Sequence, residues 1–283
     1  MSKVDPQQVI KDISGIYTLP TAYHRINAAI DDPGSSNSQI GAIISEDPGL
    51  AARVLRLANS AFYNFPSKID SVAKAITILG TQQIRDLVLA TSVIKVFSGI
   101  SEEIVTMKSF WQHSIACGVT AKIIASQRRE PNIESYFLAG LLHDIGSLIL
   151  YTGLPKAASQ IVSHARKHNK LLHLLEKKAL GFDHAQLGGM LLKEWKLPKH
   201  LCDAVTNHHQ PKSTDPLHFE TESVHVGDII VHSLQFGSNG ENFVPKLDSK
   251  AWKRLGQKES SVNNYFSLLE TQYDDIVSAL LDP

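Results

Sequence analysis

The chain has 283 residues, of which 43% are hydrophobic, and its 28 basic and 28 acidic residues cancel. This length exceeds one average domain and allows either one large body or two sub-domains around an ample core. The balanced charge excludes a broad basic face for duplex DNA or an anionic membrane, although a local basic pocket is compatible with it. Cys117 and Cys202 are too few for a disulfide framework, which favours a reducing cytoplasm. No apolar leader follows Met1 and no window of about eighteen uninterrupted apolar residues occurs, so we expect neither export nor a membrane span.

Apolar residues recur at steps of three and four along most of the chain, whereas the period-two alternation of strands never persists. Asp47-Pro48 resembles an N-cap followed by proline at the first helical position, and Asn37 or Ser38 can cap the helix before it. Ser71 and Gly80 can bound the helix after it. The expected helices cover residues 9–30 in two parts, 40–44, 50–58, 72–79, 81–97, 108–126, 135–149, 157–168, 171–180, 187–195, 198–209, 219–236 and 261–281.

These elements predict an all-α fold, a multi-helix bundle of antiparallel helices joined by short loops. We expect an N-terminal helical lobe over residues 1–100, a second lobe over residues 101–237, and a C-terminal loop and helix over residues 238–283. The second lobe is distinguished by polar side chains at helical positions where the periodicity predicts apolar ones.

The stretch from Phe137 to Gly146 is the most unusual, because an apolar run that predicts a buried helix ends in His143 beside Asp144. Burying an imidazole and a carboxylate costs several kcal/mol unless a partner satisfies them. A divalent cation satisfies both groups. The ordinary alternative is a hydrogen-bonded His–Asp pair that caps a core helix. Partners elsewhere in the chain are needed to choose between these interpretations.

Further ligand-type side chains interrupt other apolar helices after residue 100. Together with the pair they are His113, His143, Asp144, His184, His208, His209 and Asp228. Imidazole and carboxylate suit zinc, iron, manganese or nickel, whereas magnesium and calcium prefer oxygen alone. Seven groups exceed what one ion takes, and helix bundles build two-metal sites from inward-facing carboxylates and imidazoles. One centre that holds two ions therefore explains all seven residues together.

The order of these residues, with Leu-Leu-His-Asp-Ile-Gly at 141–146, resembles the HD superfamily of metal-dependent phosphohydrolases. The doubled histidine is similar to that of its HD-GYP branch. The first half of the chain resembles the HDOD domain, the HD-related output domain of bacterial signalling proteins. This second resemblance rests on Glu-Asp-Pro-Gly-Leu at 46–50, Arg-Val-Leu-Arg-Leu-Ala-Asn-Ser-Ala at 53–61 and Ala-Ile-Thr-Ile-Leu-Gly at 75–80. It spans about residues 12–235.

The resemblance implies how the ligands divide between the two ions. One ion would take His113, His143, Asp144 and Asp228, and the other would take Asp144, His184, His208 and His209. Asp144 would bridge the ions and, if the site is active, would position a hydroxide for attack on phosphorus. The reaction would then be phosphoester hydrolysis. Two divalent transition-metal ions are implied, with iron or manganese favoured and zinc or nickel as alternatives.

Two departures from the HD-GYP pattern bear on activity. That branch usually has lysine after His-Asp-Ile-Gly, where this chain has Ser147, and the loss of a phosphate-binding cation weakens catalysis. It also has Gly-Tyr-Pro after the doubled histidine, where this chain has Gln-Pro-Lys-Ser at 210–213. HDOD domains, in turn, have generally shed most catalytic HD residues, whereas this chain keeps a full ligand set. The resemblance therefore implies a metal site more firmly than it implies turnover.

Two hypotheses follow. In the preferred one, the chain is a cytoplasmic signal-transduction module with little or no hydrolase activity, which offers a surface or pocket to a signalling protein or a nucleotide. In the alternative, it is an active metal-dependent phosphodiesterase on a nucleotide or cyclic dinucleotide. Neither hypothesis includes a membrane partner or an extended nucleic-acid face.

Two groups of basic side chains are expected to be solvated rather than part of the site. They are His164, His168 and His173, and Lys193, Lys196 and Lys199. His225 and His232 lie about one helical turn either side of Asp228 and either orient the ligands or have an ordinary role. Asn59 and Ser60 are expected to lie within a helix and to hydrogen-bond between helices.

Overall fold

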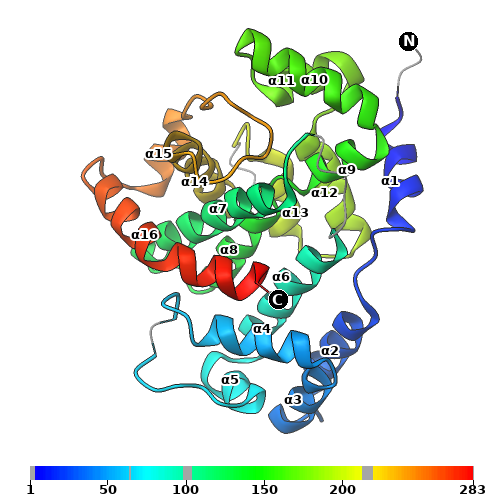
Figure 1. Ribbon diagram of the computed structural model, residues 1–283. Coiled ribbons are helices and arrows are strands. Elements are labelled where there is room, and N and C mark those ends of the chain that lie inside the picture. The colour runs from blue at the N-terminus through cyan, green and yellow to red at the C-terminus, as the bar shows by residue number, and fades with distance from the viewer. Residues whose placement is uncertain (1–3, 64, 98–103, 212–218, 283) are drawn as a thin grey trace. The chain divides into compact units, whose positions relative to one another are not determined.

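The computed structural model describes residues 4–63, 65–97, 104–211 and 219–282, and no strand occurs in these ranges (Figure 1). The helices are α1 (Pro6–Ser14), α2 (Thr21–Asp31), α3 (Asn37–Ser45), α4 (Pro48–Ala58), α5 (Val72–Leu79), α6 (Thr81–Val96), α7 (Met107–Arg128), α8 (Ile133–Leu142), α9 (Ile145–Gly153), α10 (Pro155–His168), α11 (Leu172–Leu180), α12 (His184–Glu194), α13 (Lys199–Asn207), α14 (Glu220–Leu234), α15 (Ser249–Leu255) and α16 (Ser261–Leu281). The predicted all-α class is confirmed. Helix α15 was not expected from periodicity, because it has only 7 residues.

Local capping explains where α4 and α5 begin and end. Asp47 accepts a hydrogen bond from Leu50 N at 3.0 Å, and Pro48 takes the first position of α4, as predicted. Ser71 caps α5 through its side chain, and Gly80 ends that helix with a φ of 93°, a backbone conformation that favours glycine.

The predicted N-cap of α3 is wrong by one residue. Ser36, rather than Asn37 or Ser38, precedes the helix and forms a capping box with Gln39. The Ser36 hydroxyl accepts from Gln39 N at 3.3 Å, and the Gln39 amide oxygen accepts from Ser36 N at 2.7 Å. This reciprocal pair satisfies two backbone donors at once, which a lone asparagine or serine cap does not.

Contacts divide the chain into two units. The larger unit comprises Met1–Tyr17 and Gly99–Leu269, and the smaller unit comprises Thr18–Ser98 and Glu270–Pro283. Helix α1 therefore groups with the second half of the sequence, and α16 begins in the larger unit and ends in the smaller one. The expected division of the chain at residues 100 and 237 stays a prediction.

In the smaller unit, α3 packs against α2 and α5, and α6 packs against α2, α4 and α5. Asn59 follows α4 as its C-cap and is exposed, so the prediction that it lies within the helix is wrong. Its amide joins α4 to the segment before α5: the nitrogen donates to Leu55 O and Ile69 O, each at 2.8 Å, and the oxygen accepts from Ile69 N at 2.7 Å. Ser60 instead donates to Leu57 O within its own turn, at 2.6 Å.

In the larger unit, α7 packs against α8 and α14 (Figure 1). Gly118 on α7 and Gly140 on α8 allow this close approach, because a Cβ at Gly140 would lie 2.6 Å from Gly118 Cα. Helix α12 packs against α9 and α13, and α1 packs against α9 and α12. The predicted ligand residues lie on α7, at the junction of α8 and α9, on α12, just after α13 and on α14.

The stretch Ile133–Gly153, which comprises α8 and α9, is 21 residues long and apolar enough to cross a membrane by length and composition. However, 94% of its most apolar window is buried inside the protein. Burial in the core of the larger unit accounts for its composition, and the two helices are separated by a polar pair.

Candidate metal centre

Helix α8 ends at Leu142 and α9 begins at Ile145, so His143 and Asp144 occupy a break between the helices. The prediction of one helix over residues 135–149 is therefore wrong at this point. Both side chains are completely buried, with 0% exposure. A carboxylate at this depth needs positive charge or hydrogen-bond donors around it.

A first cluster of ligand atoms surrounds one oxygen of this carboxylate. Asp144 Oδ2 lies 3.0 Å from His143 Nε2 and 3.6 Å from His113 Nε2. Asp228 Oδ1, from α14, lies 3.1 Å from His113 Nε2 and 3.5 Å from His143 Nε2. One ligand atom each from His113, His143 and Asp228 fall within 4.8 Å of one another, a spacing that could hold a metal ion.

A second cluster surrounds the other oxygen. Asp144 Oδ1 lies 3.1 Å from His184 Nε2 and 3.7 Å from His208 Nε2. His209 Nε2 lies 2.8 Å from His184 Nε2. The ligand atoms of these three histidines also fall within 4.8 Å of one another. The structure thus brings all seven predicted residues together, and the two Asp144 oxygens face different clusters. Metal binding by these residues stays a prediction.

Hydrogen bonds to the backbone orient two of the imidazoles. His143 Nδ1 lies 2.7 Å from Gly140 O, and His208 Nδ1 lies 2.8 Å from Val205 O. A carbonyl oxygen only accepts, so Nδ1 must carry the proton in both rings. The Nε2 atom of each ring then has its lone pair free when the ring is neutral, as a metal ligand requires.

Glu176 orients a third imidazole and was not singled out from the sequence. Its Oε2 accepts from His184 Nδ1 at 2.7 Å and from His184 N at 2.9 Å. Glu176 is 2% exposed although it lies on α11 next to Lys177 and Lys178. A carboxylate that fixes the far nitrogen of a histidine sets its tautomer and raises its basicity as a ligand.

Three histidines outside the predicted ligand set contact the cluster. His225 Nδ1 donates to the His208 carbonyl at 2.7 Å, which fixes the backbone of a predicted ligand. His232 Nε2 lies 3.2 Å from Asp228 Oδ1. His173 is buried, and its ring stacks on His209 with 4.0 Å between centroids, so the prediction that it is solvated is wrong.

The other basic residues expected to be solvated are exposed, as predicted. They are His164, His168, Lys193, Lys196 and Lys199. Of the segment that replaces Gly-Tyr-Pro, residues 212 and 213 lie outside the described residues.

The close packing of α9 on α12 makes Gly146 necessary. A Cβ at this position would overlap the carbonyl of His184 and would lie 2.6 Å from Gly188 N. Only glycine leaves room for this approach, which brings Asp144 Oδ1 to the His184 ring.

For several side chains of the centre, neighbouring charges shift the pKa in the direction opposite to the effect of burial. Burial alone lowers the pKa of His143 and of His184, but nearby carboxylates outweigh it and hold both pKa values well above the usual range. Burial raises the pKa of Asp144, yet the facing imidazoles hold it well below its usual value. Burial and the neighbouring cationic imidazoles lower the pKa of His208 to about 3 and that of His209 well below its usual range. The protein on its own therefore balances its carboxylates with protonated imidazoles.

The donor set fits a transition-metal pair. His143 Nε2, His208 Nε2 and Asp144 Oδ1 are buried and have no well-aligned hydrogen-bond partner. Buried polar atoms without partners are rare and need an explanation. These three atoms come from both clusters, and imidazole nitrogen with carboxylate oxygen is the chemistry that iron, manganese, zinc and nickel accept.

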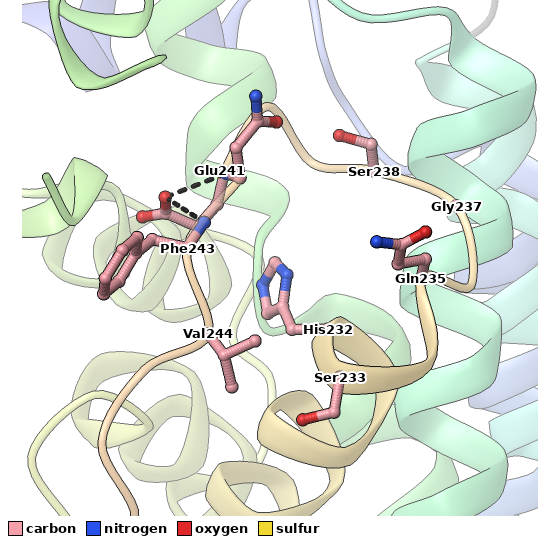
Figure 2. A pocket seen from close by; sticks show the side chains of 9 residues that line it. His232, Ser233, Gln235, Gly237, Ser238, Glu241, Phe243 and Val244 are labelled. Atoms are coloured by element: carbon pink, nitrogen blue, oxygen red, sulfur yellow. Dashed lines mark hydrogen bonds between the residues drawn. The ribbon is translucent and has the colours of Figure 1, made fainter. Parts of the chain in front are cut away.

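Two pockets are lined by residues of the centre or by residues that contact it. One, of about 450 Å³, is lined by His232 and by the loop after α14, and Figure 2 shows the His232 ring between Val244 and Glu241. The other, of about 210 Å³, is lined by His173, His209 and Lys177 among others.

Comparison with known proteins identifies the family. The sequence pattern of the HDOD domain matches residues 16–211. A curated protein of Treponema pallidum, itself uncharacterized, is 25% identical over 210 residues, which cover 72% of this chain. The chain spans only 40% of the length of that relative.

Solved structures share the fold. An HDOD domain protein of unknown function from Geobacter sulfurreducens has a TM-score of 0.76 at 23% identity, covering 98% of this chain and 97% of that one. A Shewanella amazonensis protein named "Putative phosphohydrolase" has a TM-score of 0.75 at 24% identity, covering 96% and 97%. Another from that organism, named "Putative metal-dependent phosphohydrolase", has a TM-score of 0.67 at 19% identity, covering 97% and 98%. The chain belongs to the HDOD domain family.

Proposed function

We propose that this chain is an HDOD signal-transduction module whose buried centre holds two divalent transition-metal ions, and that it has little or no hydrolase activity. The observation that carries the proposal is the arrangement of Asp144, whose two oxygens face separate groups of ligand atoms. A carboxylate with this arrangement suits a bridge between two cations. The resemblance to the HD superfamily favours iron or manganese, and the donors also accept zinc or nickel.

Bound ions of this kind would supply Lewis acidity toward a phosphate. The described residues around the centre offer few other groups for holding such a substrate. Among the described residues, none that lines the pocket at His232 is lysine or arginine. In the pocket at His209, Lys177 is accompanied by Asp183, whose charge opposes it. A phosphodiester needs positioning groups in addition to the metals, so these linings support binding without efficient turnover.

Ser147, which replaces the lysine of the HD-GYP pattern, is only 2% exposed. Its side chain influences the pKa of Tyr151, whose hydroxyl donates to Asn239 O at 2.6 Å. This position therefore supports the loop after α14 and provides no cation for a substrate.

The second candidate is a metal-dependent phosphohydrolase acting on a nucleotide or cyclic dinucleotide. The specific observation in its favour is the complete set of seven ligand-type residues, and two relatives of the same fold carry phosphohydrolase names. A nucleotide or a signalling protein as the partner, and a cytoplasmic location, remain parts of the proposal.

The test begins with elemental analysis of protein expressed with ample iron and manganese, compared with Asp144→Ala. We expect close to two ions per wild-type chain and almost none in the variant. Turnover of cyclic di-GMP and of bis(p-nitrophenyl) phosphate is then measured with each metal, and we expect wild type to differ little from Asp144→Ala. Metal-free wild-type protein would contradict the metal site.

Robust wild-type hydrolysis that Asp144→Ala abolishes would contradict the signal-transduction proposal and support the second candidate, an active phosphohydrolase. Ser147→Lys extends the comparison, because it restores the HD-GYP residue. A gain of hydrolysis in Ser147→Lys alone would show a competent metal site that lacks only its cationic clamp.

A further inference from the structure

The loop after α14, residues 236–248, lies beyond the residues that match the HDOD domain. The start of this loop is bonded to α7 close to His113, a predicted ligand. Ser238 N donates to Ser109 O at 3.0 Å, and a Cβ at Gly237 would lie 2.5 Å from His113 N. Gly237 has a φ of 63°, which favours glycine. The loop is thereby drawn close over the first cluster.

The side chain of Asn239, two residues after Gly237, points into the centre. Its side chain is 5% exposed, and its amide nitrogen donates a short hydrogen bond to Asp144 Oδ2. This is the oxygen that faces His113 and His143. A carboxylate oxygen has two acceptor sites, so one can serve the amide while the other serves an ion.

The orientation of the Asn239 amide is fixed by its other contacts. Glu241 N donates to Asn239 Oδ1 at 2.9 Å, and since a backbone N–H can only donate, the amide oxygen must be on that side. The nitrogen is then the atom that meets Asp144. Tyr151 Oη donates to Asn239 O at 2.6 Å, which holds the backbone of the same residue.

Glu241 in turn anchors the loop. Its carboxylate accepts from Leu172 N at 2.6 Å and from the backbone N–H groups of Asn242 and Phe243, at 2.9 and 3.0 Å. Figure 2 shows the last two bonds at the edge of the pocket. Asn239 therefore faces the centre from a segment tied to α7, α9 and the start of α11.

We propose that Asn239 is a positioning residue of the metal centre, holding the Asp144 carboxylate in the rotation that gives one oxygen to each cluster. The inference rests on the proposed metal site and extends it to a residue outside the matched family segment. Without the amide, the carboxylate loses its donor on Oδ2 and gains rotational freedom. Loss of a group that orients a metal ligand typically weakens metal binding by about 10–100-fold.

The test measures the affinity of the full chain for Mn²⁺ and Co²⁺ by competition with a chelator. Asn239→Ala is expected to weaken binding of at least one ion by about tenfold or more. It should also change the visible absorption of the Co²⁺-loaded protein, which reports ligand geometry. Asn242→Ala is the matched control, since this exposed asparagine lines the pocket on the same loop, and it should leave both readouts unchanged.

Wild-type affinity and an unchanged Co²⁺ spectrum in Asn239→Ala would overturn this inference and leave the metal site standing. Wild-type protein that binds no metal would instead refute the proposed site itself. If Asn239→Ala does not fold, Tyr151→Phe carries the test, because it removes only the hydroxyl that holds Asn239 O. A several-fold weaker affinity is expected for that variant, and an unchanged affinity would overturn the inference.

Discussion

The larger unit buries charged side chains at two places, and it balances their charge differently at each. Lys122 and Glu134 are each 5% exposed and form an ion pair of 3.5 Å, so the protein supplies both signs of charge. At the candidate metal centre, the buried Asp144 and Asp228 face imidazoles instead. Burial of a charged side chain therefore does not by itself identify a metal ligand. A buried carboxylate that faces several imidazoles, whose protons a metal ion can replace, is the better marker.

The largest effect is expected for Asp144→Ala, which removes the bridge between the two clusters. Both ions should be lost, and with them the stabilisation that metal gives to the folded state, about 4 kcal/mol when metal is present at a thousand times its dissociation constant. Thermal melting with and without Mn²⁺ measures this. The wild-type melting temperature should rise with metal, and that of the variant should not.

Asp274→Ala, at an exposed position of α16, is the control and should keep the metal-dependent rise. A metal-dependent rise in Asp144→Ala equal to that of wild type would contradict the role of Asp144.

The Lys122–Glu134 pair should behave in the opposite way. Lys122→Met leaves the buried Glu134 without its cation and should cost about 3 kcal/mol of unfolding free energy in urea. The double variant Lys122→Met/Glu134→Leu should recover most of that loss, since an apolar pair of similar size replaces the charges. Metal content should stay at the wild-type value in both. Loss of metal in the double variant would show that the two charged regions are coupled.

The sequence predicts the seven clustered residues because each interrupts an apolar helical pattern, and this signal survives without knowledge of the packing. Glu176 gave no such signal: it precedes Lys177 and Lys178 on an amphipathic helix, and only the packing of α11 beside α12 buries it against His184. Asn239 lies in a stretch with Gly237 and Gly240 that is typical of a solvated loop.

Helix ends were predicted where capping chemistry is local, as at Asp47-Pro48 and Ser71. The break at His143-Asp144 was not, because no proline or helix-ending glycine precedes it in a stretch of high apolar content. The partners of these two residues come from α7, α12 and α14, which are distant in sequence. Tertiary contacts therefore determine this helix break, which the periodicity of the sequence does not predict.

Protons should compete with metal for this centre. The pKa values of His143 and His184 lie well above the usual range, so in the metal-free protein both rings hold protons at neutral pH. A raised pKa stabilises the metal-free fold at low pH, and this contribution is lost as the pH rises through the raised values. Metal binding must release these protons, so affinity should increase with pH by about tenfold per unit for each proton released.

Calorimetric titration with Mn²⁺ between pH 6 and 8, in buffers of different ionisation enthalpy, counts the protons. About one proton per ion is expected, one from each side of Asp144. His208 and His209, whose pKa values are lowered, should release none. A pH-independent affinity would contradict this charge balance.

The smallest effect is expected for Glu176→Gln, which keeps the shape of the side chain and removes the charge beside His184. Affinity for the ion at the second cluster should fall by about tenfold, with the first ion retained. Chelator competition separates the two ions by affinity. Equal weakening of both ions would mean that the clusters do not bind separately.

Anomalous X-ray diffraction at the iron or manganese edge, from crystals grown with that metal, tests the metal centre most directly. We predict two peaks on opposite sides of the Asp144 carboxylate. One should lie among His113, His143 and Asp228, and the other among His184, His208 and His209. A single peak, or no peak among these residues in metal-replete crystals, would contradict a two-metal centre bridged by Asp144.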